Sequence, residues 1–528
     1  MASPDPVKKS QHVSGTGLLC DRGIKRRSFI KKNVLATTGL ILANNLFHKR
    51  ECIASVDPAQ KVNLFPAPAG EEAAPDWSVT VDGDPVFVYA ARVSAVPFNQ
   101  IWPGYQRPLD QTELAGFVYW DMSGPVTVQV TCRRLIKDVV IRPTRYRIQP
   151  RVENQTITFD LPEPWYLTVE VNGTHQALHL FPSPPEGAAP DPKDPQVTYF
   201  GPGIHRPGIM QLKSNQTVYI AGGAVVYGAI QAREASGLRI CGRGILDVSA
   251  IERSQTAGAI VLLGCTDVRI EGIIIRDSNL YGVAPTGCRN VRINGIKLIG
   301  FWRYNSDGID LMNCQDVTVE RCFVRSFDDS LVLKGCSFAG YKATHLPVQD
   351  IAITGCVVWN DWGRALEIGA ETSAPEMCRV VFRDCDVIHV SYCAMDIQHG
   401  DRAAIHDITF EDIRVEVDEK NYPLIIQKTK EEKYPADAPL YRPRLMVMEI
   451  VKTGWNVDAE RGTMRDILMK DIKVLGPYLL DSRMTGYDAE HRVERVTIEN
   501  LSHNGVKIKT LDEGKLDVST YTDGIVIR

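Results

Sequence analysis

A short pattern of alternating apolar residues recurs along the chain and constrains its fold more than any other feature. It reads apolar, any, apolar, any, small or polar, apolar, any, apolar, as in the run from Val268 to Ile275. Because side chains alternate between the two faces of a strand, each copy predicts a short strand, a bend and a second strand. Further copies begin at Val291, Val317, Ile351, Val380, Ile408, Ile467 and Val496, and a weaker copy begins at Leu238.

The spacing of these copies indicates how the strands are arranged. From Val268 onward the successive intervals are 23, 26, 34, 29, 28, 59 and 29 residues, without amphipathic helix patterns between them. Strands that recur at such a period are typical of a parallel β-helix, in which every coil stacks on the one before. Asp or Asn directly precedes most copies, as at Asp267 and Asn290, and these residues suit turn geometry. The longest interval holds a charged insertion, residues 428–444, which we expect at one edge of a cleft.

Cysteines keep the register of this repeat. One set lies three residues before a copy begins, and another lies five residues after. Small apolar residues stack well inside a coil, so these thiols are expected in the core rather than in disulfides or a metal site. The two sets are Cys265, Cys288 and Cys314, and Cys322, Cys356 and Cys385.

The region before the repeat has a different pattern. Alternating runs at 79–88, 126–130, 157–159 and 167–171 are separated by turn residues. They predict short antiparallel strands, and hence a small β-sandwich over residues 60–181. Residues 182–195 contain six prolines and read as a linker, after which the β-helix would occupy residues 197–528. The fold class expected is therefore all-β.

The N-terminal residues 1–55 are predicted to contain an export signal rather than part of the fold. Lys25, Arg26 and Arg27 are followed by Ser-Phe-Ile-Lys and then by a modest apolar stretch from Val34 to Phe47. Paired arginines before an aromatic residue, an apolar residue and a lysine resemble a twin-arginine export signal. We therefore expect a bacterial protein that is exported to the periplasm or the cell exterior.

Charge and hydropathy exclude two classes of partner. The net charge is −4 and the chain has no long basic run, so nothing favours nucleic-acid binding. After residue 60 no apolar stretch approaches the length of about 18 residues that an integral membrane helix needs. Apolar content of 44% and charged content of 23% are typical of a folded globular chain.

Three aspartates lie at equivalent points of two successive coils. Asp307 belongs to Asn305-Ser306-Asp307-Gly308, and the pair Asp328-Asp329 begins 21 residues later. Stacked coils lie about 4.8 Å apart, so these carboxylates and Asp310 are expected to lie close together. Because such a group cannot all be ionised when buried, at least one carboxyl should be protonated and able to act as a general acid.

A second strand in each coil extends this site. Aligning the strands puts Asp310, Val332, Glu367 and Asp396 in one outward column, with Met312, Lys334, Gly369 and Gln398 beside it. Arg364 shares the register of Asp307 and Asp329. The residues predicted to contact substrate are Asn305, Asp310, Lys334, Arg364, Glu367, Asp396 and Gln398. Four aromatic residues near the same ends of the coils are candidates for stacking on a sugar: Tyr304, Trp359, Trp362 and Tyr392.

These motifs resemble those of the polygalacturonase clan of glycoside hydrolases, which contains family 28 and the related dextranase family. Residues 305–308 match the family 28 motif Asn-Thr-Asp-Gly, and Asp328-Asp329 match its Asp-Asp pair. The resemblance covers about residues 197–528, and a β-sandwich ahead of a right-handed β-helix resembles the dextranase branch. It implies single-displacement hydrolysis with inversion, in which Asp328 is the general acid and Asp307 and Asp329 deprotonate water. No cofactor and no metal are expected.

Two departures from the family motifs bear on the substrate. The family's Gly-His-Gly falls at Gly363-Arg364-Ala365, and its Arg-Ile-Lys falls at Asp396-Ile397-Gln398. In the family those cationic residues hold the galacturonate carboxylate, for which Arg and Lys are suited. The sequence therefore disfavours homogalacturonan, and favours a neutral sugar, or an acidic sugar held by Arg364 or Arg402.

The expected function is that of an exported glycoside hydrolase acting on a pectin-type or neutral polysaccharide or its oligosaccharides. Two alternatives remain. A polysaccharide lyase uses the same fold, and the aspartates would then bind calcium through their oxygens. A non-catalytic β-helix would bind carbohydrate without turnover. All three readings predict carbohydrate as the partner, with no nucleic acid and no integral membrane segment.

Overall fold

The computed structural model describes residues 61–95, 109–418, 422–423 and 440–528. Residues Ser55–Arg528 form one compact unit. Among the residues described, no helix is long and apolar enough to cross a membrane. The predicted export signal and most of the predicted insertion at 428–444 lie outside the described residues.

Two sheets make up the region before the coils. Their buried faces share one apolar cluster, which includes Trp77, Val128, Phe159 and Leu180. Pairing is antiparallel except between β11 and β5, which run parallel. The first sheet contains β1 (Val62–Leu64), β4 (Tyr89–Ser94), β5 (Thr112–Met122), β7 (Val139–Arg142), β10 (Leu167–Val171) and β11 (Leu178–Ser183). The second contains β2 (Trp77–Val81), β3 (Asp84–Val86), β6 (Val126–Cys132), β8 (Arg151–Glu153) and β9 (Thr156–Leu161). Two short 3-10 helices accompany them, η3 (Leu109–Gln111) and η4 (Thr144–Tyr146).

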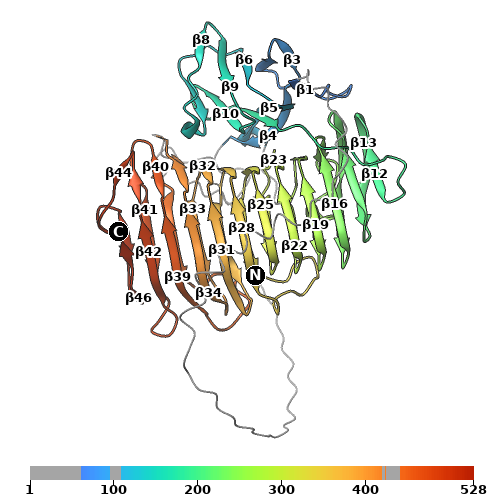
Figure 1. Ribbon diagram of the computed structural model, residues 1–528. Coiled ribbons are helices and arrows are strands. Elements are labelled where there is room, and N and C mark those ends of the chain that lie inside the picture. The colour runs from blue at the N-terminus through green and yellow to red at the C-terminus, as the bar shows by residue number, and fades with distance from the viewer. Residues whose placement is uncertain (1–60, 96–108, 419–421, 424–439) are drawn as a thin grey trace, which may run out of the picture. The chain divides into compact units, whose positions relative to one another are not determined.

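The remaining chain winds into a right-handed parallel β-helix, so the predicted fold class is confirmed. Figure 1 shows its strands side by side, from green near β12 to red near the C-terminus. One long sheet contains the predicted repeat strands: β12 (Val197–Phe200), β14 (Thr217–Ile220), β16 (Ser236–Gly242), β19 (Thr266–Glu271), β22 (Arg289–Asn294), β25 (Gln315–Glu320), β28 (Val348–Thr354), β31 (Glu376–Arg383), β34 (Ala404–Glu411), β39 (Thr463–Lys470), β42 (Val493–Glu499), β46 (Thr522–Asp523) and β47 (Val526–Ile527).

The second long sheet contains two rows of strands. The row of short strands is β17 (Ile245–Asp247), β20 (Ile274–Arg276), β23 (Lys297–Ile299), β26 (Phe323–Ser326), β29 (Val357–Asn360), β32 (Asp386–His389), β35 (Arg414–Glu416), β40 (Lys473–Leu475) and β43 (Ser502–His503), which pairs with β44 (Val506–Lys507). The other row is β13 (Gly203–Leu212), β15 (Ala224–Arg233), β18 (Gly258–Leu263), β21 (Tyr281–Thr286), β24 (Ile309–Met312), β27 (Leu331–Gly335), β30 (Arg364–Thr372), β33 (Cys393–His399), β38 (Arg444–Ile450), β41 (Asp481–Thr485) and β45 (Leu516–Val518). A separate hairpin pairs β36 (Tyr422–Pro423) with β37 (Leu440–Tyr441).

The predicted register of the repeat is confirmed by the strand pairing. Val268 pairs with Val291, which pairs with Val317, and the series continues through the later copies. Asp267 and Asn290 have φ of 55° and 52°, in the left-handed region that Asp and Asn adopt more readily than other non-glycine residues. The six repeat cysteines are buried free thiols, as expected.

The region before the coils packs on the row of short strands. Aromatic rings from the first sheet, such as Phe117 and Phe181, share a buried cluster with Phe323 and Trp359 of the coils. Charged residues of the same row are also covered: Arg142 Nη1 lies 2.5 Å from Glu416 Oε2, and its Nε lies 3.0 Å from Glu170 Oε2 on β10. Burying charges requires such pairing, so these contacts fix how this face of the coils is covered.

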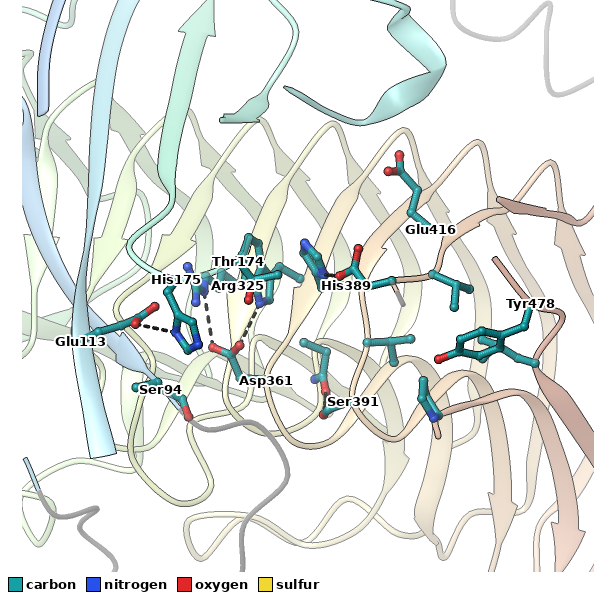
Figure 2. A pocket seen from close by; sticks show the side chains of 18 residues that line it. Ser94, Glu113, Thr174, His175, Arg325, Asp361, His389, Ser391, Glu416 and Tyr478 are labelled. Atoms are coloured by element: carbon teal, nitrogen blue, oxygen red, sulfur yellow. Dashed lines mark hydrogen bonds and ion pairs between the residues drawn. The ribbon is translucent and has the colours of Figure 1, made fainter. Parts of the chain in front are cut away.

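A cavity of about 190 Å³ remains between the first sheet and the coils (Figure 2). Glu113 and His175 line it from one side, and Arg325, Asp361 and His389 from the other. Its charged groups are paired with one another, as His175 Nδ1 with Glu113 Oε2 at 2.9 Å. None of the predicted catalytic aspartates lines this cavity, so the catalytic site must be sought elsewhere.

Candidate active site

The structure brings the three predicted catalytic aspartates together. Asp307 stands just before β24, and Asp328 and Asp329 stand just before β27, the next strand of the same row. The backbone N–H of Gly308 donates to the carbonyl of Asp329 at 2.8 Å, which ties the two turns to each other. One carboxylate oxygen from each aspartate lies within 4.8 Å of the others.

Short-range hydrogen bonds hold the turn that carries Asp328. The Asn360 side chain donates to the carbonyl of Asp328 at 2.7 Å, and the Ser326 hydroxyl donates to the same oxygen at 2.7 Å. The backbone N–H of Asp329 donates to Asp328 Oδ1 at 3.0 Å. Gly363 leaves room for the Asp329 side chain, because a Cβ at position 363 would lie only 2.6 Å from Asp329 Oδ1. The site is thus held by both neighbouring coils.

The three carboxyls differ in protonation. Burial, with the neighbouring Asp307 and Asp329, raises the pKa of Asp328 well above its usual value. Burial also raises the pKa of Asp307, but Lys334 limits this rise, and the resulting value is about 6. Burial alone would raise the pKa of Asp329, yet Arg364 and Lys334 hold it below its usual value. The surroundings therefore favour the protonated form of Asp328 and the ionised form of Asp329.

Lys334 lies at the centre of the first part of the site. Its Nζ is 3.0 Å from Asp307 Oδ2, 3.2 Å from Asp310 Oδ1 and 3.6 Å from Asp329 Oδ2. Asp310 is fully buried, and burial together with Asp307 raises its pKa well above the usual range. Neither Asp310 oxygen has a hydrogen-bond partner among the described residues, so its contact here is the ion pair with Lys334.

Arg364 contacts three carboxyls, as Lys334 does: those of Asp329, Glu367 and Asp396. Its Nε is 2.9 Å from Asp396 Oδ2 and 3.7 Å from Glu367 Oε1, and its Nη1 is 3.7 Å from Asp329 Oδ1. Burial raises the pKa of Glu367 well above its usual value and that of Asp396 to about 7. The strand register confirms the predicted column, because Val332 pairs with Glu367 and Glu367 pairs with Asp396.

A comparison with known protein families identifies the family of this chain. The family described as glycosyl hydrolases family 28 matches residues 212–476, half of the chain, and this range contains every predicted site residue. The chain belongs to glycosyl hydrolases family 28. The predicted resemblance is therefore confirmed, and the chain is an O-glycosyl hydrolase of this family.

Individual relatives are distant. A probable polygalacturonase of Vitis vinifera is 26% identical over 115 residues, which are 22% of this chain and only 23% of that protein. The structure of Dex49A from Penicillium minioluteum has a TM-score of 0.60 at 15% identity and covers 88% of this chain and 96% of its own. A hyperthermoactive exopolygalacturonase from Thermotoga maritima has a TM-score of 0.46 at 17% identity, covering 63% and 84%. The likeness to Dex49A establishes a shared fold.

This family 28 member buries most of the residues predicted to contact substrate. Asp310, Glu367 and Asp396 have no exposed surface, and Gln398 is 8% exposed. Asn305 accepts a hydrogen bond from Arg253 Nη2 at 3.0 Å, which orients its side chain toward that arginine. The buried carboxyls contact Lys334 and Arg364, and direct contact of the seven predicted residues with a sugar stays a prediction.

A cavity of about 440 Å³ lies beside Lys334, which contacts Asp307 and Asp329 of the predicted catalytic group. Lys334 lines it together with Tyr281, Glu371, Arg402 and Trp455. Trp455 was not predicted from the sequence, although it is 57% exposed and offers an aromatic face. The only signal was a tryptophan within a Thr-Gly-Trp-Asn loop after the long insertion.

The four aromatic residues named as candidates for stacking on a sugar differ in exposure. Tyr304 and Trp359 are only 3% exposed, which leaves little ring surface for a sugar, whereas Trp362 and Tyr392 are half-buried, so stacking by at least one of the four stays a prediction. Trp359 packs against Arg325, whose Cζ lies 3.9 Å from its ring centre, under the first sheet. Tyr304 and Trp362 pack against each other with ring centres 5.4 Å apart.

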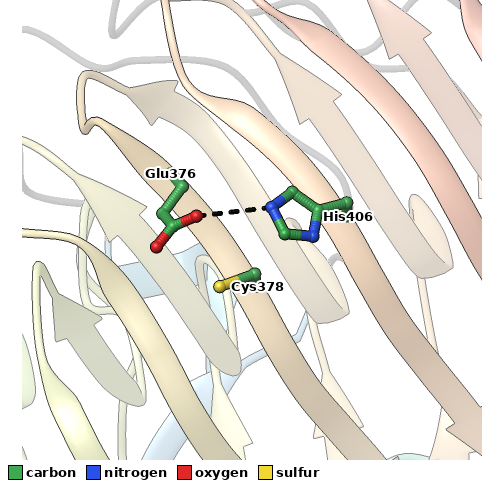
Figure 3. Close-up of side chains that lie close together, drawn as sticks. All are labelled: Glu376, Cys378 and His406. Carbon is green, nitrogen blue, oxygen red and sulfur yellow. Dashed lines mark ion pairs between the residues drawn. The ribbon is translucent and has the colours of Figure 1, made fainter. Parts of the chain in front are cut away.

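A second cluster of ligating side chains lies on the other long sheet (Figure 3). Glu376 and Cys378 of β31 meet His406 of β34, with one ligand atom from each within 4.8 Å of the others. The group has its own partners: Glu376 Oε2 lies 3.4 Å from His406 Nε2, and Arg379 Nη1 donates to Cys378 Sγ at 3.1 Å. Burial raises the pKa of Cys378 to about 11, which disfavours the thiolate that a metal requires. The cluster is best described as an ion-pair group.

Proposed function

We propose that this family 28 enzyme cleaves O-glycosidic bonds of a polysaccharide or its oligosaccharides by acid/base single displacement with inversion. Asp328 is the general acid, and Asp307 and Asp329 hold and deprotonate the attacking water. One observation carries the proposal: three carboxyls lie within 4.8 Å of one another while their surroundings push their pKa values apart.

The reaction follows from these protonation states. Asp328 gives its proton to the glycosidic oxygen as the bond to the anomeric carbon breaks, and the bonding electron pair goes to that oxygen. Water attacks the anomeric carbon from the opposite face and passes a proton to Asp307 or Asp329. Lys334 and Arg364 keep these two groups ionised until the proton arrives.

The spacing of the carboxylates bears on whether hydrolysis inverts or retains the anomeric configuration. One oxygen from each of the three aspartates lies within 4.8 Å of the others. The two catalytic carboxyl groups are about 6.5–9.5 Å apart in inverting glycosidases and about 5–5.5 Å apart in retaining ones. The spacing here is closer to that of retaining enzymes. Asp307 Oδ2 accepts a hydrogen bond from Lys334, and Asp329 Oδ1 accepts one from the backbone N–H of Arg364 at 3.2 Å, so both carboxylates are fixed in place, as either a base or a nucleophile requires. Inversion is proposed because the motifs resemble those of a single-displacement family.

The test of the acid is Asp328→Asn, which keeps the shape and removes the proton donor. We expect kcat to fall at least ~10²-fold with an unchanged melting temperature, because general acid catalysis contributes about that much. Asp267→Asn is a matched control, since Asn290 occupies the equivalent turn in the next coil. Near wild-type kcat in Asp328→Asn would remove this residue from the acid role.

The stereochemical test is proton NMR of the first product formed from a defined oligosaccharide. Single displacement requires that the new reducing end first appear in the anomeric configuration opposite to that of the cleaved bond. Initial retention would instead make Asp307 or Asp329 a nucleophile and would overturn the single-displacement mechanism while leaving hydrolysis intact.

Export through the twin-arginine route is also part of the proposal, supported by the sequence of residues 25–31. The check is expression of the full chain in a bacterium with that pathway, followed by fractionation. Replacing Arg26 and Arg27 by Lys should retain the protein in the cytoplasm; unchanged export would refute the assignment.

A further inference from the structure

The cations near the catalytic carboxylates are already matched by carboxyls of the protein itself. Arg364 faces Asp329, Glu367 and Asp396 at 2.9–3.7 Å, and its Cζ lies 4.7 Å from the ring centre of Tyr392. The closest of these contacts, from Nε to Asp396 Oδ2, fixes the guanidinium on the strand next to its own. Arg364 is therefore engaged within the protein before any substrate binds.

Lys334 is engaged in the same way, because its Nζ lies within 3.6 Å of Asp307, Asp310 and Asp329. Arg402, which lines the same cavity as Lys334, donates from Nη1 to Asp458 Oδ1 at 2.6 Å and from Nη2 to the carbonyl of Thr344 at 2.7 Å. Each of these three cations thus has at least one carboxylate of the protein in contact.

Carboxyls outnumber cations in this group. Among the described residues, six carboxyls surround two cations: Asp307, Asp310, Asp328, Asp329, Glu367 and Asp396 around Lys334 and Arg364. Each of the two cations lies within 3.7 Å of three of these carboxyls. A substrate carboxylate would therefore have to compete with the protein's own carboxyls for Lys334 or Arg364.

Gln398, which lies next to this group on β33, has no charge. Gln398 follows Asp396 by two residues on β33, and it keeps some exposed surface, as does the Arg364 side chain at 20%. The Gln398 amide donates to Glu449 Oε1 at 3.4 Å and retains donor and acceptor capacity toward hydroxyl groups. An amide discriminates sugars by hydroxyl geometry and adds no attraction for an anion.

We propose that the sugar lying against Arg364 and Gln398 is uncharged, so that the substrate is a neutral glycan or one in which neutral sugars alternate with uronates. This inference rests on the proposed function, because it concerns the same cleft. Asp396 and Glu367 act through Arg364 as specificity-setting groups and do not touch the substrate. A glycan with a uronate at every position is disfavoured.

The experiment compares three sets of size-matched oligosaccharides, with uronate at every position, at alternating positions and at none. For the wild type, we expect kcat/KM for the best alternating or neutral member to exceed that for the all-uronate member at least ~10-fold. If the all-uronate member is the best substrate, the inference fails and the proposed hydrolysis stands. If no member is hydrolysed, the proposed function fails for these glycans, and calorimetric binding of the same members to the wild type decides the charge preference. Tighter binding of the all-uronate member, or binding of none, overturns the inference.

A charge variant tests the residue assignment. Gln398→Lys adds a cation on β33, two residues from Asp396, and should raise the preference for the all-uronate member at least ~10-fold over wild type. Gln349→Lys is the matched control, since it adds the same charge on β28 of the other long sheet. An equal change in both variants, or no change in Gln398→Lys with its fold intact, would contradict the assignment.

Discussion

Lys334 sets the protonation of the proposed base, and its removal gives the sharpest test of the site. Its Nζ lies 3.0 Å from Asp307 Oδ2, and the pKa of Asp307 is about 6 because the lysine partly offsets burial. Lys334→Met keeps an unbranched chain of similar length and removes the charge. Without that charge the ionised form of Asp307 loses support, so its pKa must rise.

The size of the effect follows from the contact. An opposite charge at this distance lowers a carboxyl pKa by about 1–3 units, so the pKa of Asp307 should move from about 6 to about 7–9. At pH 5 the ionised fraction then falls by about 10-fold to 10³-fold, at about 1.4 kcal/mol for each unit. The pKa of Asp328 rises too, because Lys334 also lowers it, so both limbs of the profile move to higher pH.

The assay is kcat/KM as a function of pH on a substrate identified in the oligosaccharide comparison. Lys473→Met is the matched control, because it removes a lysine whose Nζ lies 2.7 Å from Asp412 in an exposed pair on β40. Lys473→Met should leave the profile unchanged. If the acidic limb of folded Lys334→Met stays where it is in the wild type, Lys334 does not control the base and the reasoning is wrong.

Two further predictions concern stability and binding. Burial by itself lowers the pKa of His389, but Glu170 and Asp418 raise it to about 9, against 6.5 in the unfolded chain. This difference stabilises the folded protein by about 3 kcal/mol. The stabilisation is complete below pH 6.5 and is lost as the pH rises through 9. Chemical unfolding of His389→Gln should therefore show that loss at pH 6 and little difference from wild type at pH 10; an equal loss at both would refute the ion-pair origin. Trp455→Ala should raise KM about fivefold with kcat nearly unchanged, since an aromatic face contributes about 1 kcal/mol, and an unchanged KM would remove Trp455 from the cleft.

The sequence predicted the coil and the column of acidic residues because both depend on a period of two residues. Placing Asp310, Glu367 and Asp396 in one column needed only the alternation of side chains along equivalent strands, and the pairing confirms it. The turn aspartates were identified for the same reason, since they stand at a fixed offset from each strand. Local pattern was sufficient wherever the neighbouring coil repeats the same backbone.

The remaining features depend on side-chain direction and on segments outside the repeat. The Arg364 side chain donates a hydrogen bond to Asp396 on the next strand of the sheet. Aligning the strands by sequence does not predict such a side-chain contact. Trp359 occupies a repeat position that would reach solvent on a bare coil, but the first sheet covers it. Trp455 lies in a non-repeating loop, where no period distinguishes a cleft residue from an ordinary surface one.

The contact between the first sheet and the coils has a consequence for modularity. β26 leads directly into the turn of Asp328, and its Arg325 is 1% exposed and donates to His179 of β11 at 3.1 Å. Chain segments nearly 150 residues apart thus share a seam that ends three residues from the proposed acid. The region before the coils is therefore not a detachable accessory: grafting it elsewhere, or exchanging it between relatives, would mean rebuilding the seam that supports the catalytic turn.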